Sequence, residues 1–187
     1  MTYVRKEGII LDAIAVSSGP GSYTGLRIGV SEAKGLSYGL GIPLIALPTP
    51  LVMASMVANR VGEDDLLCPM IDARRMEVYA TFFDRSLETV RPTSADIVDG
   101  ESYLDLLTRH KVHFFGNGAS KCRGVITHPH AYFLEELHPL ASGMVPLAEK
   151  AFAGKQFVDT AYFEPHYLKE FVATVPKNKI IPQPKTI

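Results

Sequence analysis

The sequence predicts an α/β protein, and two stretches indicate this class. In the first, an apolar run from Leu11 to Val16 leads into a glycine-rich turn and then into a long helical pattern. In the second, two apolar runs, Leu66 to Asp72 and Glu77 to Asp84, flank a short polar turn as in a β-hairpin. The composition fits a globular fold, because 47% of the 187 residues are hydrophobic and 21% are charged. We therefore expect two α/β units.

Charge, cysteine content and hydropathy argue against several classes of protein. The net charge of −1 does not provide the positive field of a stand-alone nucleic-acid binder, so a partner would supply most of that charge if RNA is bound. Cys68 and Cys122 match no disulfide framework or metal spacing, and we expect reduced thiols. No apolar run is long enough for a bilayer, and no apolar signal core follows the first basic residues. The expectation is a cytoplasmic protein with no membrane partner.

The stretch from Ser17 to Gly41 organises the first unit. Its opening glycines and proline predict a turn. Thr24 to Leu40 then predicts a helix, with Ser22 or Thr24 as N-cap and a glycine stop at Gly41. The unit is thus strand, glycine-rich turn and helix.

The predicted helix has two different faces at 100° per residue. One face carries small and apolar residues, namely Gly25, Gly29, Ala33, Leu36 and Leu40. The other carries Arg27, Ser31, Lys34 and Tyr38. Glycine inside a helix costs about 0.5–1 kcal/mol relative to alanine, so Gly29 and Gly35 predict close approach of another element. That element is either this chain's own sheet or a helix of a partner.

The remaining sequence predicts alternating strands and helices. A strand within Ile42 to Pro50 precedes a helix from Pro50 to Asn59, with Thr49 as its cap. The polar break from Gly62 to Asp65 indicates a domain boundary. Further along we expect a loop at Arg91 to Asp99, a helix at Glu101 to His110, strands at Val112 to Phe115 and His128 to Phe133, and a helix at Leu140 to Gly154.

The turn GPGSYTG does not fit the common phosphate-binding patterns. It lacks the Gly-Lys-Ser/Thr of a Walker loop, and its third glycine comes one residue late for G-x-G-x-x-G. Gly21, Ser22 and Thr24 are candidates for an anion site at the helix N-terminus. The alternative is a structural turn that sets the angle of the helix.

A charged turn follows the first strand of the hairpin. It contains Asp72, Arg74, Arg75 and Glu77. One interpretation of this turn is a solvent-exposed corner stabilised by salt bridges. The other interpretation is functional: Asp72, at a strand end, belongs to the candidate anion site, and the two arginines bind phosphates or acidic partners.

No catalytic centre can be identified from the residues themselves. His128 and His130 have strand spacing for one face, but the neighbouring sequence offers no third ligand. The patterns His-Glu-x-x-His and Gly-x-Ser-x-Gly are absent. We predict no catalytic residue and no metal site.

The chain resembles the TsaB (YeaZ) family of bacterial tRNA threonylcarbamoyladenosine biosynthesis proteins. The resemblance is carried by SSGPGSYTGLRIGVSEAKGLSYGLGIPLIALPTP and PMIDARRMEVYATFFD, within Leu11 to Asp84, and by EPHYLKE, Glu164 to Glu170. It implies an actin/Hsp70-like ATPase (ribonuclease-H-like) fold with an N-terminal lobe at residues 1–62, a second lobe at 63–175 and an extended tail at 176–187. Because the family begins with strands and a helix ahead of Leu11, we expect an incomplete first lobe with an unpaired strand edge.

The resemblance also implies a non-catalytic partner subunit. In this family the catalytic partner TsaD transfers a threonylcarbamoyl group from its adenylate to the adenosine beside the tRNA anticodon, and the ATPase TsaE joins them. ATP and threonylcarbamoyl-adenylate would be handled by the complex, with no cofactor for this chain alone and with tRNA contacted indirectly. A homodimer is expected in the absence of TsaD. The expected contact residues are Gly25, Arg27, Gly29, Val30, Ala33, Lys34, Leu36 and Tyr38.

Two enzymatic alternatives remain open. One is a nucleotide-dependent phosphoryl or acyl transferase that uses GPGSYTG as an anion cradle. The other is a glycoprotease-like peptidase, which follows from an old name of the superfamily, although the metal-binding histidine motif of the catalytic paralogue is missing here. ATPases of this fold have a glycine-rich phosphate loop where this chain has Ala73-Arg-Arg-Met76, so independent ATP hydrolysis is not expected.

Overall fold

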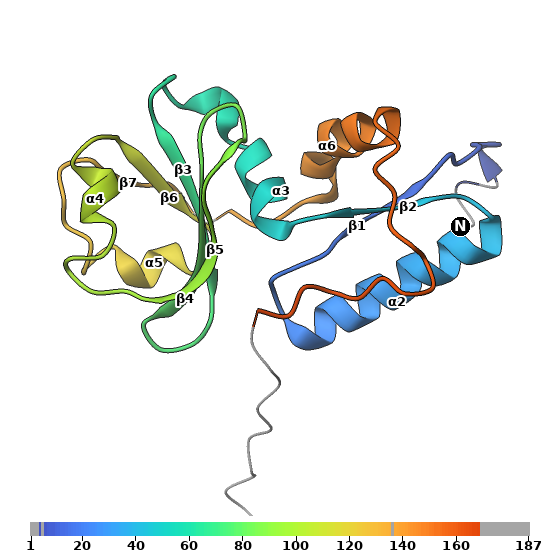
Figure 1. Cartoon of the computed structure of the whole chain (residues 1–187), viewed down its shortest axis with the longest axis horizontal. Coiled ribbons are helices and arrows are strands. Elements are labelled where there is room, and N and C mark those ends of the chain that lie inside the picture. Colours follow the sequence, from blue (N-terminus) through green and yellow to red (C-terminus); the bar gives the residue numbers. More distant parts are fainter. Residues whose placement is uncertain (1–3, 5, 136, 169–187) are drawn as a thin grey trace, which may run out of the picture.

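The computed structural model describes residues 4, 6–135 and 137–168, which form two lobes (Figure 1). The larger lobe is built on a five-stranded sheet with the order β5-β4-β3-β6-β7. Strands β3, β4 and β5 form an antiparallel meander, whereas β6 and β7 run parallel to β3. The strands are β3 (Leu66–Asp72), β4 (Glu77–Phe83), β5 (Thr89–Ile97), β6 (Val112–Phe115) and β7 (Ala131–Phe133).

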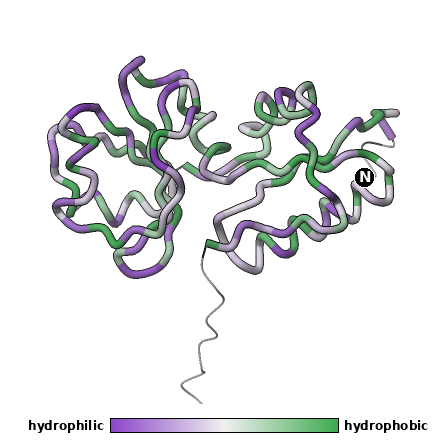
Figure 2. The backbone as a smooth tube through the Cα atoms, viewed as in Figure 1, coloured by the Kyte–Doolittle hydropathy of each residue, from purple (hydrophilic) through white to green (hydrophobic). Residues whose placement is uncertain are grey.

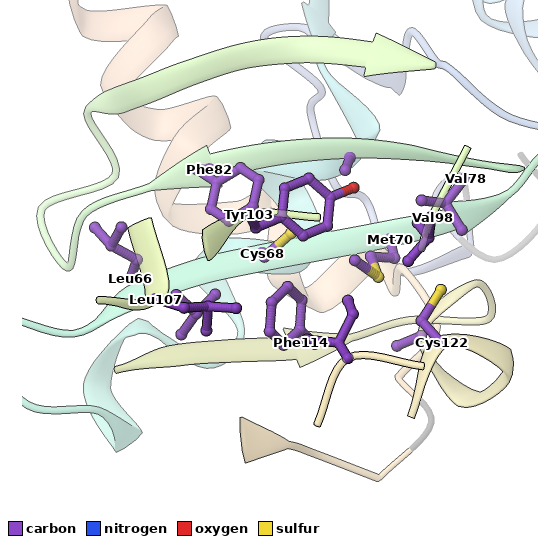
Figure 3. Close-up of a cluster of buried hydrophobic side chains, with 14 residues drawn as sticks. Leu66, Cys68, Met70, Val78, Phe82, Val98, Tyr103, Leu107, Phe114 and Cys122 are labelled. Carbon is purple, nitrogen blue, oxygen red and sulfur yellow. The ribbon is translucent and has the colours of Figure 1, made fainter. Parts of the chain in front are cut away.

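Helices cover both faces of this sheet. On one face, α4 (Leu104–Leu107) and α5 (Ala119–Cys122) enclose a core that includes Phe82, Tyr103 and Phe114 (Figure 3). On the other face, α3 (Thr49–Ser55) buries Met53 against the alternate side chains of the same strands. Because successive strand residues point to opposite faces, the near-continuous apolar sequence of β3 serves both cores.

The smaller lobe is a two-stranded sheet between two helices. Strands β1 (Ile14–Ser17) and β2 (Leu44–Leu47) pair in parallel and are joined by α2 (Tyr23–Leu40). Helix α6 (Ala141–Ala153) covers the opposite face, where Ala151 is buried against the strands. Figure 2 shows the hydrophobic residues concentrated along β1 and β2. Within the described residues β1 has β2 as its one neighbour.

The expected division of the chain at residue 62 needs correction. Helix α3 precedes that point, yet it buries Met53 and Ala54 on the sheet of the larger lobe. Helix α6 follows it, yet it packs on the smaller lobe. Residues beyond α6 also return there, since the Val158 N–H donates to the Leu44 carbonyl at 2.9 Å. The expected tail at 176–187 lies outside the described residues.

Most predicted elements are present, with altered ends. Strand β1 begins three residues later than the run that starts at Leu11, and the helix predicted to Asn59 divides into α3 and a 3-10 turn at Ala58–Arg60. Thr49 does not cap α3 from outside, because it lies in the helix. Its hydroxyl instead bonds the Ser17 hydroxyl at 2.6 Å and accepts from the Gly19 N–H at 3.1 Å.

The loop prediction at Arg91 to Asp99 is wrong. These residues contribute to β5, which pairs antiparallel with β4. The sequence does not indicate this strand, because it contains Pro92 and its buried and exposed residues do not alternate regularly. Proline is tolerated in β5 because β5 is an edge strand of the sheet. The helix predicted at Glu101 to His110 is reduced to α4, and α5 was not predicted.

Substitution of Gly118 tests how closely the loop after β6 approaches β3. A Cβ at Gly118 would lie 2.9 Å from the Ile71 carbonyl carbon and 3.0 Å from the Asp72 nitrogen. Gly118→Ala should therefore lower the free energy of unfolding by about 2 kcal/mol in urea denaturation. Gly124→Ala is the matched control, since its Cβ would meet nothing within 4 Å, and a change as large as that of Gly118→Ala would contradict the packing argument.

Candidate functional site

Helix α2 contacts its own lobe along a narrow stripe. Its N-cap is Ser22, whose hydroxyl accepts from the Gly25 N–H at 3.3 Å, and it ends at Gly41, which has a left-handed φ of 65°. The buried residues of the helix are Val30, Ala33 and Ser37. These positions share one side of the helix, and their small side chains allow a close approach to the strands.

The glycines of α2 lie away from this stripe. A Cβ at Gly29, Gly35 or Gly39 would meet no atom within 4 Å. Nearby apolar side chains are also uncovered, with Ile28 at 64% and Tyr38 at 86% exposure. The interpretation that Gly29 and Gly35 pack on this chain's own sheet is therefore wrong. The interpretation that a partner approaches them stays a prediction.

The expected contact residues divide into two groups. Val30 and Ala33 are 3% and 6% exposed, so they are buried within the chain and their assignment to a partner surface is corrected. The other six are at least partly exposed, namely Gly25, Arg27, Gly29, Lys34, Leu36 and Tyr38.

One flank of α2 is covered by the segment that follows α6. The Lys34 ammonium donates to the carbonyls of Ala161 at 3.1 Å and Phe163 at 2.9 Å. The Ser37 hydroxyl bonds the Thr160 hydroxyl at 3.1 Å. A shallow pocket of about 270 Å³ remains between helix and segment. Lys34 thus holds the polar flank of α2 to its own chain.

Arg27 lies at the N-terminal end of the same flank. Its guanidinium is 4.3 Å from the centre of the Tyr23 ring, and the Tyr23 and Tyr167 rings are 4.7 Å apart. Hydrogen bonding to Tyr167 and the nearby tyrosine hydroxyls raise the pKa of Arg27 above its ordinary value. The polar flank is therefore largely engaged within the chain, and the glycine-bearing face is the part of α2 that remains open.

The glycine-rich turn before α2 packs closely against two other segments of the chain, at Thr49 and His166. Gly19 has a φ of 100°, and a Cβ there would lie 2.8 Å from the His166 carbonyl. The Thr49 N–H donates to the Gly19 carbonyl at 2.9 Å, and the His166 N–H donates to Ser18 at 2.8 Å. These contacts give the turn a structural role. Of the candidate anion residues, Ser22 serves as the helix cap.

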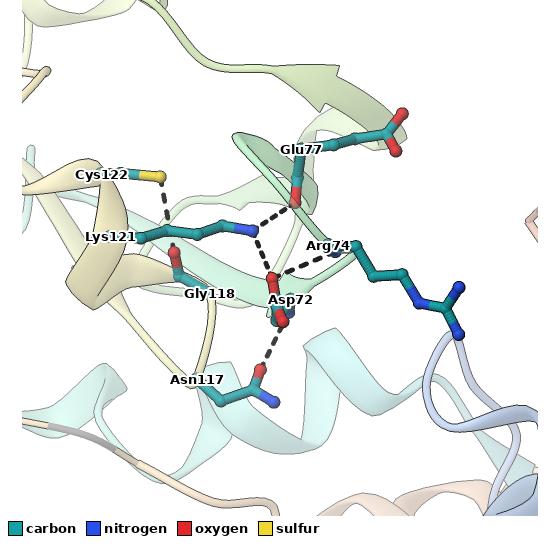
Figure 4. Close-up of polar contacts among 7 residues, drawn as sticks. All are labelled: Asp72, Arg74, Glu77, Asn117, Gly118, Lys121 and Cys122. Carbon is teal, nitrogen blue, oxygen red and sulfur yellow. Dashed lines mark hydrogen bonds and ion pairs between the residues drawn. The ribbon is translucent and has the colours of Figure 1, made fainter. Parts of the chain in front are cut away.

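Asp72 lies at the end of β3 in the larger lobe, apart from those turn residues (Figure 4). Its carboxylate forms an ion pair with Lys121 and accepts from the Arg74 N–H at 3.2 Å. The Lys121 ammonium also donates to the Glu77 carbonyl at 2.7 Å, and Asn117 accepts from the Asp72 N–H at 3.0 Å. Lys121 holds the pKa of Asp72 below its usual range. The carboxylate is thus held within the fold.

The turn after Asp72 has an unusual backbone. Arg74 and Arg75 have φ values of 73° and 49°, in the left-handed region that favours glycine and asparagine. Both side chains are exposed, and neither forms an ion pair within the described residues. The expected salt-bridged turn is therefore present only in part: Asp72 forms an ion pair, but with Lys121 and not with an arginine of the turn.

The remaining candidates form no site. Cys68 and Cys122 are buried free thiols, and burial raises the pKa of each. The His128 ring accepts from the His130 N–H at 3.2 Å. Residues 4, 6–135 and 137–168 include no group of three His, Cys, Asp or Glu side chains arranged to hold a metal ion. No helix in this part of the chain is long and apolar enough to cross a bilayer.

Comparison with known proteins identifies the family. The family model described as tRNA N6-adenosine threonylcarbamoyltransferase matches residues 8–177. The tRNA threonylcarbamoyladenosine biosynthesis protein TsaB of Escherichia coli K12 is 31% identical over 180 residues, which cover 87% of this chain and 73% of that protein. The chain belongs to the TsaB (YeaZ) family. The TsaB protein of Bacillus subtilis 168 is 44% identical over 73 residues, which span 31% of that protein.

Solved structures of the TsaB (YeaZ) family have the same fold. A Pseudomonas aeruginosa protein described as similar to the peptidase YEAZ superposes with a TM-score of 0.74 and 25% identity, over 90% of this chain and 80% of that one. YeaZ from the same organism gives a TM-score of 0.71 and 26% identity, over 88% and 79%. The chain therefore has the two-lobed actin/Hsp70-like fold predicted for it.

Relief of backbone strain at the hairpin should stabilise the chain. In the double variant Arg74→Asn with Arg75→Gly, both positions carry residues that tolerate a positive φ. The free energy of unfolding should therefore rise by about 1 kcal/mol. The control, Arg74→Ala with Arg75→Ala, removes the same charges but keeps a Cβ at both positions. Equal stabilities of the two variants in urea unfolding would mean that strain is not the cause.

Proposed function

We propose that this chain is a non-catalytic partner subunit in the synthesis of threonylcarbamoyladenosine in tRNA. The observation that carries the proposal is the open, glycine-bearing face of α2, at which a Cβ added to Gly29 or Gly35 would meet no atom of the described residues within 4 Å. The names of its TsaB relatives supply the pathway. The proposed partner is TsaD, which contributes the catalytic site.

The argument for a partner helix rests on helix energetics. Each exposed glycine weakens α2 by about 0.5–1 kcal/mol relative to alanine, and no contact within the described residues compensates for this loss. Glycine allows two helix backbones to approach more closely than larger residues do. Ile28 and Leu40, which are both exposed, supply apolar area that a partner can bury. The same face can pair two copies of this chain when TsaD is absent.

The proposal leaves the chemistry to the complex. In this proposal ATP and threonylcarbamoyl-adenylate are handled by the complex with TsaD and the ATPase TsaE, and this chain needs no cofactor of its own. Two observations support this division. The Gly19 N–H and carbonyl of the glycine-rich turn are bonded to Thr49, and Asp72 is neutralised by Lys121.

Gly29→Leu is the most direct test of the proposed interface. Because its side chain projects from the open face, the isolated variant should fold at least as stably as the wild-type chain. Its affinity for TsaD, measured by calorimetry, should fall by about tenfold or more, since the leucine holds the facing helix away. The same variant should shift the homodimer towards monomer in sedimentation.

Gly124→Leu is the matched control, because this glycine also has open space around it but lies in the larger lobe. An unchanged affinity of Gly29→Leu for TsaD would remove α2 from the interface. The non-catalytic role is tested separately, by tRNA modification assays with and without TsaD and TsaE. Product formation by this chain alone would overturn that part of the proposal.

A further inference from the structure

We propose that the hairpin tip, residues 73–76 between β3 and β4, contacts the phosphate backbone of the tRNA that the complex modifies. The proposal rests on the proposed function, because it takes tRNA as the substrate of the complex that this chain joins. The tip carries Arg74 and Arg75, both exposed. Their guanidinium groups have no ion-pair partner in the described part of the chain.

The charge at the tip is only partly balanced by its neighbours, because Arg74 and Arg75 face one adjacent acidic residue, Glu77, besides the paired Asp72. Asp72 is the nearest acidic residue before the tip, and Lys121 already forms an ion pair with it. In Figure 4 the Arg74 side chain extends away from this cluster, and Glu77 points in a different direction. A positive spot therefore projects from a chain whose net charge is −1.

The backbone conformation at positions 74 and 75 gives no structural reason for arginine. Both residues have a positive φ, which glycine or asparagine adopts with less strain. The side chains form no hydrogen bond within the described residues that would compensate, since the contact of Arg74 with Asp72 uses its backbone N–H. The arginines are thus surface groups kept in an unfavourable backbone conformation, as is common at functional sites.

The surroundings of the tip favour phosphate over a protein surface. Protein interfaces have an apolar centre, and no large hydrophobic residue at 73–76 is among the exposed ones of the described chain. The α2 face, by contrast, exposes Ile28 and Tyr38. A guanidinium binds phosphate oxygens in a bidentate manner without base specificity. Two such contacts suit an auxiliary role, in which the partner supplies most of the positive field.

The arrangement of the lobes is compatible with this role. In Figure 1 the hairpin tip and the N-terminal end of α2 lie at the same side of the molecule. RNA held by a partner that docks on α2 is therefore near the tip. The opposite end of the sheet carries Arg60 and Arg109, which are also exposed.

The test compares two double variants in the assembled complex with TsaD. Arg74→Ala with Arg75→Ala should weaken tRNA binding about tenfold, and should lower the slope of log K against log salt by about 1.5. Arg60→Ala with Arg109→Ala removes the same charge from the opposite end of the sheet and should change binding less than about twofold. Arg74→Lys with Arg75→Lys keeps both charges and should retain the wild-type salt slope, but it should bind tRNA more weakly than the wild-type chain because an ammonium cannot contact phosphate in a bidentate manner.

The outcomes separate the two proposals. Equal tRNA affinity and salt slope for the 74/75 and 60/109 alanine variants would overturn the phosphate contact. Weaker assembly with TsaD, with unchanged tRNA affinity once assembled, would assign the arginines to an acidic protein surface and would also overturn it. Assembly is therefore measured first without RNA. If the wild-type chain does not assemble with TsaD, the proposed function fails. The phosphate contact is then tested by tRNA binding to the isolated chain at low ionic strength. A lower tRNA affinity of the 74/75 alanine variant supports the contact, and an unchanged affinity rejects it.

Discussion

The narrow packing of α2 on two strands determines which surfaces the molecule presents. Val30, Ala33 and Ser37 bring the helix close to β1 and β2, but this stripe covers only part of its circumference. Lys34 fastens the flank beside it to the segment after α6. What remains open is the glycine-bearing face, where a Cβ at Gly29, Gly35 or Gly39 would meet no atom of the described residues within 4 Å. The candidate interface is thus a consequence of how little of α2 its own lobe covers.

The smaller lobe is assembled from segments far apart in the sequence. The glycine-rich turn near the start of the chain contacts His166 near the end of the described residues, and Gly19 is required there because a Cβ would meet the His166 carbonyl. Helix α6 closes the other face of the same two strands. Such long-range contacts form late in folding, since loop closure must precede them. The larger lobe combines a local β3–β4–β5 meander with the long-range parallel pairing of β3 and β6.

The sequence was most informative where a local pattern determines the structure. Ser22, Gly41 and Gly154 mark helix ends through capping and left-handed geometry, and β3, β4 and β6 follow from short apolar runs. The lobe to which α3 and α6 belong could not be predicted, because an apolar helix face does not identify the sheet it covers. The same limit applies to α2, where the helical wheel separated two faces but left open which element covers the small-residue face, and Val30 and Ala33, expected at a partner surface, are buried within the chain. The Lys121–Asp72 pair joins residues 49 positions apart, and no local signal indicates it.

The hairpin tip illustrates how one turn can favour one mode of phosphate contact over another. In ATPases of this fold, glycines at this position let backbone N–H groups approach an enclosed nucleotide. Here Arg74 and Arg75 place side chains on the same turn, which blocks that approach and projects two guanidinium groups outward. Asp72, which begins the turn, is neutralised by Lys121 instead of facing a ligand. In the proposed role the turn contacts phosphates of a large molecule outside the lobes, and independent nucleotide hydrolysis is not expected of it.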